Sequence, residues 1–262
     1  MSLLNTHEPV FDYKTLYDTD QISMWLDLST YCNAACPQCH RTDANGLGKI
    51  GWLPNVQWSF EEFRQAFPIE TMMHIHRFDI CGTWGDPMMN KDIWKILEYI
   101  IKGSNCWIVI NTNGSIRDED WWWKLGLLTG KRLTVVWAID GINQEQHARY
   151  RQQTDLNKIL MNMEAFNSAG GKSEVFTVVF KHNEKDIHNI ARMIKDLGTT
   201  TLFLVKSNRF YSNSTFHFVK STGEDDLLER STLPDDDSLY WKSIHLSEEN
   251  IEWIKNESLK GK

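Results

Sequence analysis

Hydrophobic and polar positions follow two different periods along most of this chain. Short apolar stretches that alternate or run continuously, as in residues 133–139 (LTVVWAI), predict strands. Longer segments with apolar side chains three and four residues apart, as in residues 91–102, predict amphipathic helices. The two kinds of segment take turns from residue 22 to residue 206. Strands are predicted at residues 24–29, 77–81, 107–110, 133–139, 175–180 and 202–205, and helices at residues 60–67, 91–102, 120–128, 157–169 and 186–197.

Regular alternation of strands and helices implies parallel strands joined by right-handed crossovers. Six such units are fewer than the eight of a closed barrel. We therefore expect an α/β fold, a partial (β/α)6 TIM-like barrel of parallel strands with outer helices. The expected organisation is an N-terminal arm at 1–21, a core domain at 22–207, and an acidic linker with a C-terminal helical appendage at 208–262.

Length and composition describe an ordinary globular protein. The 262 residues are 41% hydrophobic and 24% charged, which suits one sizeable domain. No apolar run approaches the roughly 18 residues of a membrane helix, and the N-terminus does not resemble a secretory signal. We expect a cytoplasmic protein with reduced thiols and no membrane partner. The net charge of −7 argues against general nucleic-acid binding.

Three of the five cysteines lie within eight residues, directly after the first predicted strand. Their spacing is Cys32-x3-Cys36-x2-Cys39. Three thiolates on one short loop can bind three irons of a cluster and leave the fourth iron without a protein ligand. An open metal position is where a metal centre does chemistry. The alternatives at this point are a zinc site, with His40 as a possible fourth ligand, and three unrelated buried cysteines.

The loop Tyr31-Cys32-Asn33-Ala34-Ala35-Cys36-Pro37-Gln38-Cys39 resembles the CxxxCxxC signature of the radical S-adenosylmethionine (SAM) superfamily. The resemblance implies one 4Fe–4S cluster, held by Cys32, Cys36 and Cys39, whose open iron binds SAM. It also implies that the reduced cluster cleaves SAM to a 5′-deoxyadenosyl radical, which abstracts hydrogen from a substrate.

Three further loops, each after a later strand, match the same family in order. Residues 82–87 (GTWGDP) resemble its glycine-rich motif, with an Asp where Glu is commoner, and imply backbone contacts to the methionine ammonium of SAM. Residues 111–114 (NTNG) resemble a segment near the ribose, and residues 138–141 (AIDG) with His147 and Arg151 resemble a stretch of peptide-modifying members in which the Arg binds the SAM carboxylate. The residues expected to bind SAM are Gly82, Thr83, Trp84, Gly85, Asp86, Asn111, Asn113, Asp140 and Arg151.

The substrate is not evident from these loops. The nearest resemblance is to SPASM-type members, which modify peptides or proteins and carry auxiliary clusters, but no cysteine follows Cys106. We expect either a single-cluster enzyme or the N-terminal portion of a split or truncated system. Its substrate would be a peptide, a protein or a small metabolite, and its electron donor a flavodoxin or ferredoxin. The alternatives are a glycyl-radical-activating enzyme and a non-catalytic iron–sulfur or zinc-binding module.

Overall fold

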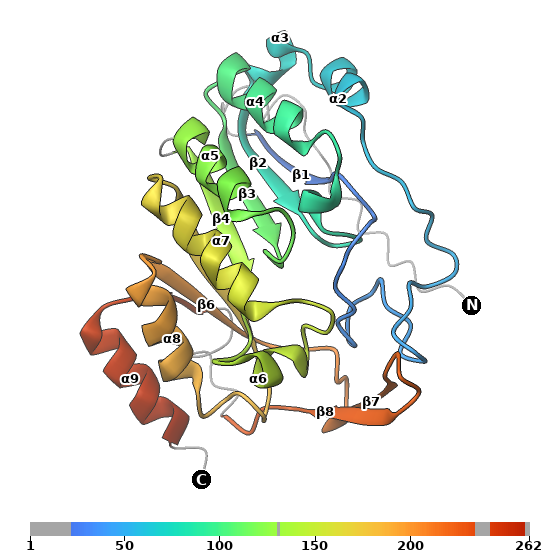
Figure 1. The fold of residues 1–262 in the computed structure, drawn as a ribbon, viewed down its shortest axis with the longest axis vertical. Coiled ribbons are helices and arrows are strands. Elements are labelled where there is room, and N and C mark those ends of the chain that lie inside the picture. Colours follow the sequence, from blue (N-terminus) through green and yellow to red (C-terminus); the bar gives the residue numbers. More distant parts are fainter. Residues whose placement is uncertain (1–21, 130–131, 234–241, 260–262) are drawn as a thin grey trace.

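The computed structural model describes residues 22–129, 132–233 and 242–259 (Figure 1). The expected N-terminal arm and the acidic run Asp235–Asp237 lie outside these ranges. Within them, a seven-stranded sheet has the order β1-β2-β3-β4-β5-β6-β9. The first six strands pair in parallel, each with the next along the chain. This order confirms the partial barrel expected from the alternation. The strands are β1 (Ile22–Asp27), β2 (Ile75–Cys81), β3 (Trp107–Thr112), β4 (Leu133–Ala138), β5 (Lys172–Val179) and β6 (Thr201–Lys206).

The helices of the described ranges pack along one face of this sheet (Figure 1). They are α2 (Phe60–Ala66), α3 (Ile69–Met72), α4 (Ile93–Gly103), α5 (Glu119–Thr129), α6 (Gln144–Ala148), α7 (Leu156–Ser168), α8 (Ile187–Asp196) and α9 (Glu248–Leu259), with a 3-10 turn at Pro87–Met89. The start of α2 follows from its sequence. Ser59 caps the backbone N–H of Glu62, and the Glu62 carboxylate accepts from the Ser59 N–H, as in a capping box.

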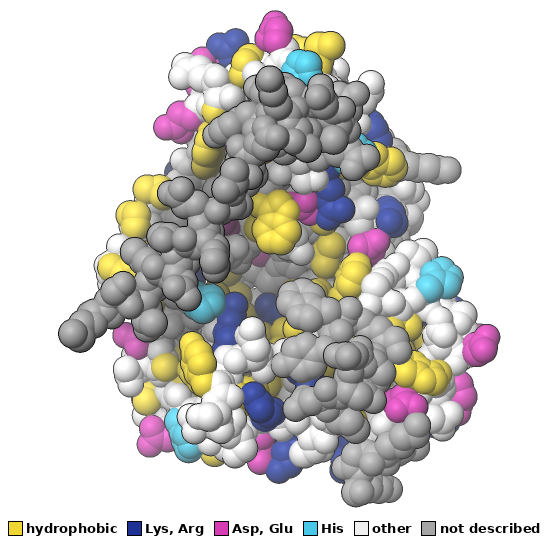
Figure 2. All heavy atoms as spheres, turned by 180° about the vertical axis from the view of Figure 1, so that it is seen from behind, with side chains coloured by type: hydrophobic (Ala, Val, Ile, Leu, Met, Phe, Trp, Pro, Cys, Tyr) yellow, Lys and Arg dark blue, Asp and Glu magenta, His cyan; other side chains and the backbone are white. Residues whose placement is uncertain are grey.

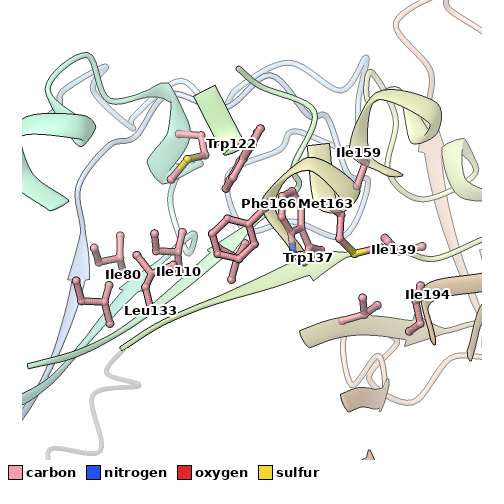
Figure 3. Close-up of a cluster of buried hydrophobic side chains, with 14 of the residues drawn as sticks. Ile80, Ile110, Trp122, Leu133, Trp137, Ile139, Ile159, Met163, Phe166 and Ile194 are labelled. Atoms are coloured by element: carbon pink, nitrogen blue, oxygen red, sulfur yellow. The ribbon is translucent and has the colours of Figure 1, made fainter. Parts of the chain in front are cut away.

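The core lies between the sheet and these helices. Figure 3 shows Trp122 of α5 and Phe166 of α7 beside Trp137 of β4, and the Trp122 and Trp137 rings have centroids 4.5 Å apart. All three side chains are fully buried. Burial of aromatic side chains of this size contributes strongly to core stability. This packing fixes the helix layer against β3 and β4 and so fixes the loops at their carboxyl ends.

The expectation that residues 208–262 form a linker and one helix is incomplete. Residues Thr215–Val219 (β7) and Asp225–Glu229 (β8) form an antiparallel hairpin, and β9 (Lys242–His245) joins the main sheet antiparallel to β6. The alternation in Thr215–Val219 (TFHFV), followed by a turn with Gly223 at φ 86°, is the strand signal that the acidic composition obscured. The expected terminal helix is present as α9.

Candidate active site

The cysteine loop begins where β1 ends, at the carboxyl edge of the sheet. Cys36 is buried, and Cys32 and Cys39 are partly buried. A turn closed by the hydrogen bond from Cys39 N–H to the Cys36 carbonyl, at 3.0 Å, brings the second and third cysteines together. Donors from two other loops face the sulfurs: Asn113 Nδ2 lies 3.9 Å from Cys32 Sγ, and Arg151 Nη1 lies 4.0 Å from Cys36 Sγ.

The environment of the cysteines suits an iron–sulfur cluster. Burial raises the pKa of the Cys36 thiol to about 11, with Arg151 partly opposing it, and burial together with the Asp86 charge raises the pKa of Cys32. Thiolates at these positions therefore need bound cations, which the irons of a cluster provide. In addition, the side chain of Gln38, which directly precedes Cys39 in sequence, is buried. Its Nε2 has no hydrogen-bond partner in the structure.

A site for a single ion finds no support. Among the described residues, no group of three His, Cys, Asp or Glu side chains is arranged to hold one metal ion. His40, the possible fourth zinc ligand, instead lies against Trp84, with ring centroids 6.4 Å apart.

The glycine-rich loop after β2 packs against the cysteine loop through its backbone. A Cβ on Gly85 would lie 2.1 Å from the Ser29 carbonyl oxygen and 2.7 Å from that of Tyr31, so only glycine fits there without displacement. The Asp86 N–H donates to the Tyr31 carbonyl at 2.7 Å. These contacts therefore fix the backbone that leads into Cys32, the first cysteine.

Asp27, at the end of β1, organises the start of the same loop and was not singled out from the sequence. Its Oδ1 accepts hydrogen bonds from the backbone N–H groups of Thr83, at 2.9 Å, and Trp84, at 3.2 Å. In the sequence, it could have been found as an acidic residue at the end of a predicted strand, on the edge of the sheet where the candidate site was expected.

The Asp86 carboxylate is buried and links the glycine-rich loop after β2 to the loop after β3. It accepts from Met88 N–H at 2.9 Å, from the Thr112 hydroxyl at 3.0 Å, and from Asn113 through both its backbone and its side-chain amide. Burial raises the pKa of Asp86, and these hydrogen bonds oppose that shift. The structure thus places Asp86 behind the loops, where it supports their backbone.

Asp140, after β4, holds Arg151 in the same way. The Asp140 carboxylate is fully buried, accepts from Arg151 Nε, and accepts from Val178 N–H at 2.6 Å. The Arg151 guanidinium also lies over the Tyr150 ring, 5.0 Å from its centroid. Burial raises the pKa of Asp140, while the Arg151 charge opposes that shift. The pair presents a fixed cation beside Cys36.

His147 supports this pair from behind. Its Nδ1 accepts from Asp140 N–H at 3.2 Å, and its Nε2 lies 3.0 Å from the Thr154 hydroxyl, which itself donates to the Arg151 carbonyl. Burial, assisted by the Arg151 charge, lowers the pKa of His147 to about 3. The ring is therefore neutral at physiological pH.

A cavity of about 620 Å³ opens in front of these loops, on the face of the sheet opposite the helix layer. Figure 2 shows hydrophobic and Lys or Arg side chains gathered in the hollow of that face. Of the residues predicted from sequence, the cavity wall includes Cys36, Cys39, Gly82, Thr83, Asn111 and Arg151. The others are not among the residues that line it: Cys32, Trp84, Gly85, Asp86, Asn113 and Asp140.

The remaining wall mixes charged and apolar side chains. β2 contributes the ion pair between Arg77 and Asp79, at 2.5 Å, and Cys81 at the strand end. β1 contributes Trp25, and β5 and β6 contribute Phe176, Phe203, Glu174 and Lys206. Cys106 lies away from the cavity, buried, where its thiol donates to the Ile75 carbonyl at 2.9 Å.

Comparison with known proteins agrees with this geometry. The model of the radical SAM superfamily matches residues 26–194. This chain belongs to the radical SAM superfamily. The cofactors characteristic of that family are a 4Fe–4S cluster and SAM, the pair that the cysteine loop and its neighbouring loops suit.

Individual relatives are distant. The chain is 25% identical over 186 residues to the GTP 3′,8-cyclase of Aquifex aeolicus, covering 68% of this chain and 54% of that protein. It is 24% identical over 177 residues to the antilisterial bacteriocin subtilosin biosynthesis protein AlbA of Bacillus subtilis, covering 66% and 36%. This chain thus spans about half of the first relative and about a third of the second.

Solved structures share the fold. SuiB of Streptococcus suis bound to S-adenosylmethionine superposes with a TM-score of 0.58 at 14% identity, covering 71% of this chain and 40% of that one. The protein anSMEcpe with bound AdoMet gives a TM-score of 0.55 at 18% identity, covering 71% and 49%. None of the helices in the described ranges is long and apolar enough to cross a membrane.

Proposed function

We propose that this chain is a radical SAM enzyme whose cysteine loop holds a 4Fe–4S cluster and that abstracts hydrogen from a peptide or protein substrate. The observation that carries the proposal is the cysteine loop at the cavity, with Arg151 fixed beside Cys36 by the buried carboxylate of Asp140. Cys32, Cys36 and Cys39 would hold the cluster. When bound, the cluster and SAM supply a 5′-deoxyadenosyl radical that abstracts a hydrogen atom.

The protein groups would bind and orient SAM. Arg151 offers charge-assisted hydrogen bonds to the carboxylate of SAM. Its side chain loses little conformational entropy on binding, because Asp140 and the Tyr150 ring already hold the guanidinium. The backbone at Gly82 and Thr83, fixed by Asp27, would face the amino group, and Asn111 lies on the wall expected to face the ribose.

A peptide substrate is supported by the cavity and by the relatives. The cavity wall combines aromatic side chains such as Phe176 and Phe203 with the charged pair Arg77–Asp79, which suits a side chain together with its peptide backbone. SuiB has been solved with its precursor peptide SuiA, and AlbA is named for bacteriocin biosynthesis. A flavodoxin or ferredoxin would supply the electron, and a reducing compartment such as the cytoplasm suits three free thiols.

Anaerobic reconstitution tests the proposal. The full chain should take up four irons and, with SAM and dithionite, form 5′-deoxyadenosine. A Cys32→Ala/Cys36→Ala/Cys39→Ala variant should do neither, whereas Cys106→Ala should keep both, because Cys106 lies away from the cavity and the cysteine loop. Uptake of zinc without iron, or a wild-type chain that holds the cluster and forms no 5′-deoxyadenosine, contradicts the proposal.

A further inference from the structure

The segment from Ser207 to Arg230 leaves the strand–helix repeat and returns to the cysteine loop. We call it the clasp segment. It runs from the end of β6 through Phe210 into the β7–β8 hairpin, and it touches the cysteine loop on both sides of Cys39. Figure 1 shows the hairpin beside the loop that follows β1.

The first contact is made with Gln38, the residue directly before Cys39. The Ser207 hydroxyl donates to Gln38 Oε1 at 2.6 Å, and Arg209 Nη1 donates to the Gln38 carbonyl at 2.5 Å. The Arg209 N–H donates to the Ser207 oxygen at 3.3 Å, which leaves the Ser207 proton for Gln38. Both the side chain and the backbone of Gln38 are therefore held from the clasp segment.

The second contact follows Cys39 in sequence. Val219 of β7 donates its N–H to the Ala44 carbonyl at 2.7 Å and accepts from Gly46 N–H at 2.9 Å. The hairpin thus pairs through its backbone with the segment that leaves the third cysteine.

Apolar packing joins the two contacts. Phe210, Phe218 and Leu228 are each at most 3% exposed and belong to one buried cluster with Ala34, Ala35 and Cys36. This group of buried hydrophobic residues is separate from the main core under the helices. Its apolar side chains cover the buried side of the cysteine loop.

The far side of the hairpin contacts the turn that follows β5. Lys181 N–H donates to the Glu229 carbonyl at 3.2 Å, and Lys181 Nζ pairs with the Glu229 carboxylate at 2.6 Å. An isolated two-stranded hairpin is marginally stable in water. The order of β7–β8 therefore depends on the cysteine loop and the turn after β5, and by the same coupling the hairpin restrains the cysteine loop.

We propose that the clasp segment holds the cysteine loop in its cluster-binding conformation and shields the cluster from oxygen and chelators, with Arg209 and Phe218 as positioning residues. The inference rests on the proposed function, because it requires the cluster. Metal sites gain affinity when their ligands are ordered before binding. Variants that remove these contacts should therefore lose the iron–sulfur cluster faster, while the stability of the apo-protein changes little.

The test uses the reconstituted full chain with Ser207→Ala/Arg209→Met, Phe218→Ser, and Arg192→Met as the matched control. Arg192 is an exposed arginine of α8 that faces Glu248, remote from the cysteine loop in sequence. Cluster absorbance is followed in air, and iron release to a chelator is followed anaerobically. Thermal unfolding of the apo-proteins measures the fold separately, and the EPR signal of the reduced cluster reports its surroundings.

We expect Ser207→Ala/Arg209→Met to lose its cluster at least several-fold faster than wild type, with a broadened EPR signal and little change in apo-protein unfolding. Phe218→Ser should lose it faster still, and Arg192→Met should match wild type. Loss at the wild-type rate in the double variant, or equally fast loss in Arg192→Met, overturns the inference, and the double variant decides if Phe218→Ser does not fold. A wild-type chain that binds no cluster contradicts the proposed function instead.

Discussion

The carboxylate of Asp86 accepts hydrogen bonds from both the backbone N–H and the side-chain amide of Asn113, at 2.8 and 2.7 Å. The same side-chain amide of Asn113 donates to Asn33 Oδ1 at 2.9 Å. Through Asn113, the Asp86 carboxylate therefore links the loops after β2 and β3 to the cysteine loop. Because Asp86 is buried, its removal cannot be offset by water.

Asp86→Asn should therefore destabilise the fold by about 1–3 kcal/mol, because the new amide group turns N–H donors toward the donors of Thr112 or Asn113. Urea unfolding measures this change, and SAM affinity should fall with it. Asp43→Asn, at an exposed carboxylate that accepts from Asn45, is the matched control. Equal stability of the two variants would contradict the linking role.

Gly85→Ala should force the glycine-rich loop away from the cysteine loop, because the added Cβ would meet the Ser29 carbonyl oxygen at 2.1 Å. Overpacking of this kind costs about 1–3 kcal/mol. We expect lower stability and less iron per chain after reconstitution, measured by chemical denaturation and iron analysis. Gly51→Ala, where an added Cβ meets nothing within 4 Å, should leave both unchanged.

Arg151→Met should be costly because it leaves the fully buried Asp140 carboxylate without its cation. Breaking a buried pair on one side costs about 3–5 kcal/mol. The double variant Asp140→Asn/Arg151→Met should regain part of that stability in urea unfolding, while its SAM binding, followed by equilibrium dialysis, stays weak. No recovery in the double variant would show that Asp140 is not the group that needs Arg151.

The low pKa of His147 predicts a loss of stability in acid. The unfolded chain takes up a proton on this ring near pH 6.5, whereas in the fold the pKa is about 3, so stability is full above pH 6.5 and declines as the pH falls toward 3. At pH 5 the loss from this group is about 2 kcal/mol. Urea unfolding from pH 7.5 to 5 should show a shallower decline for His147→Gln and the wild-type decline for the exposed His76→Gln.

The sequence by itself determined the alternation of strands and helices from residue 22 to residue 206, because hydrophobic periodicity and caps such as Ser59–Glu62 are local. It also placed the three cysteines together, since they share one short loop, and it placed the other rim loops at one edge, because parallel strands end on one side. The family could be inferred from those features.

Only the tertiary structure decided which side chains face the cavity and which support it. Asp27 meets Thr83 across 56 residues, and Arg209 meets Gln38 across 171. No local pattern encodes such pairs, because they depend on how loops from distant strands pack at the rim. For the same reason the clasp segment resembled a linker in sequence: its strands are weak by themselves, and their order comes from the cysteine loop and the turn after β5, on which they pack.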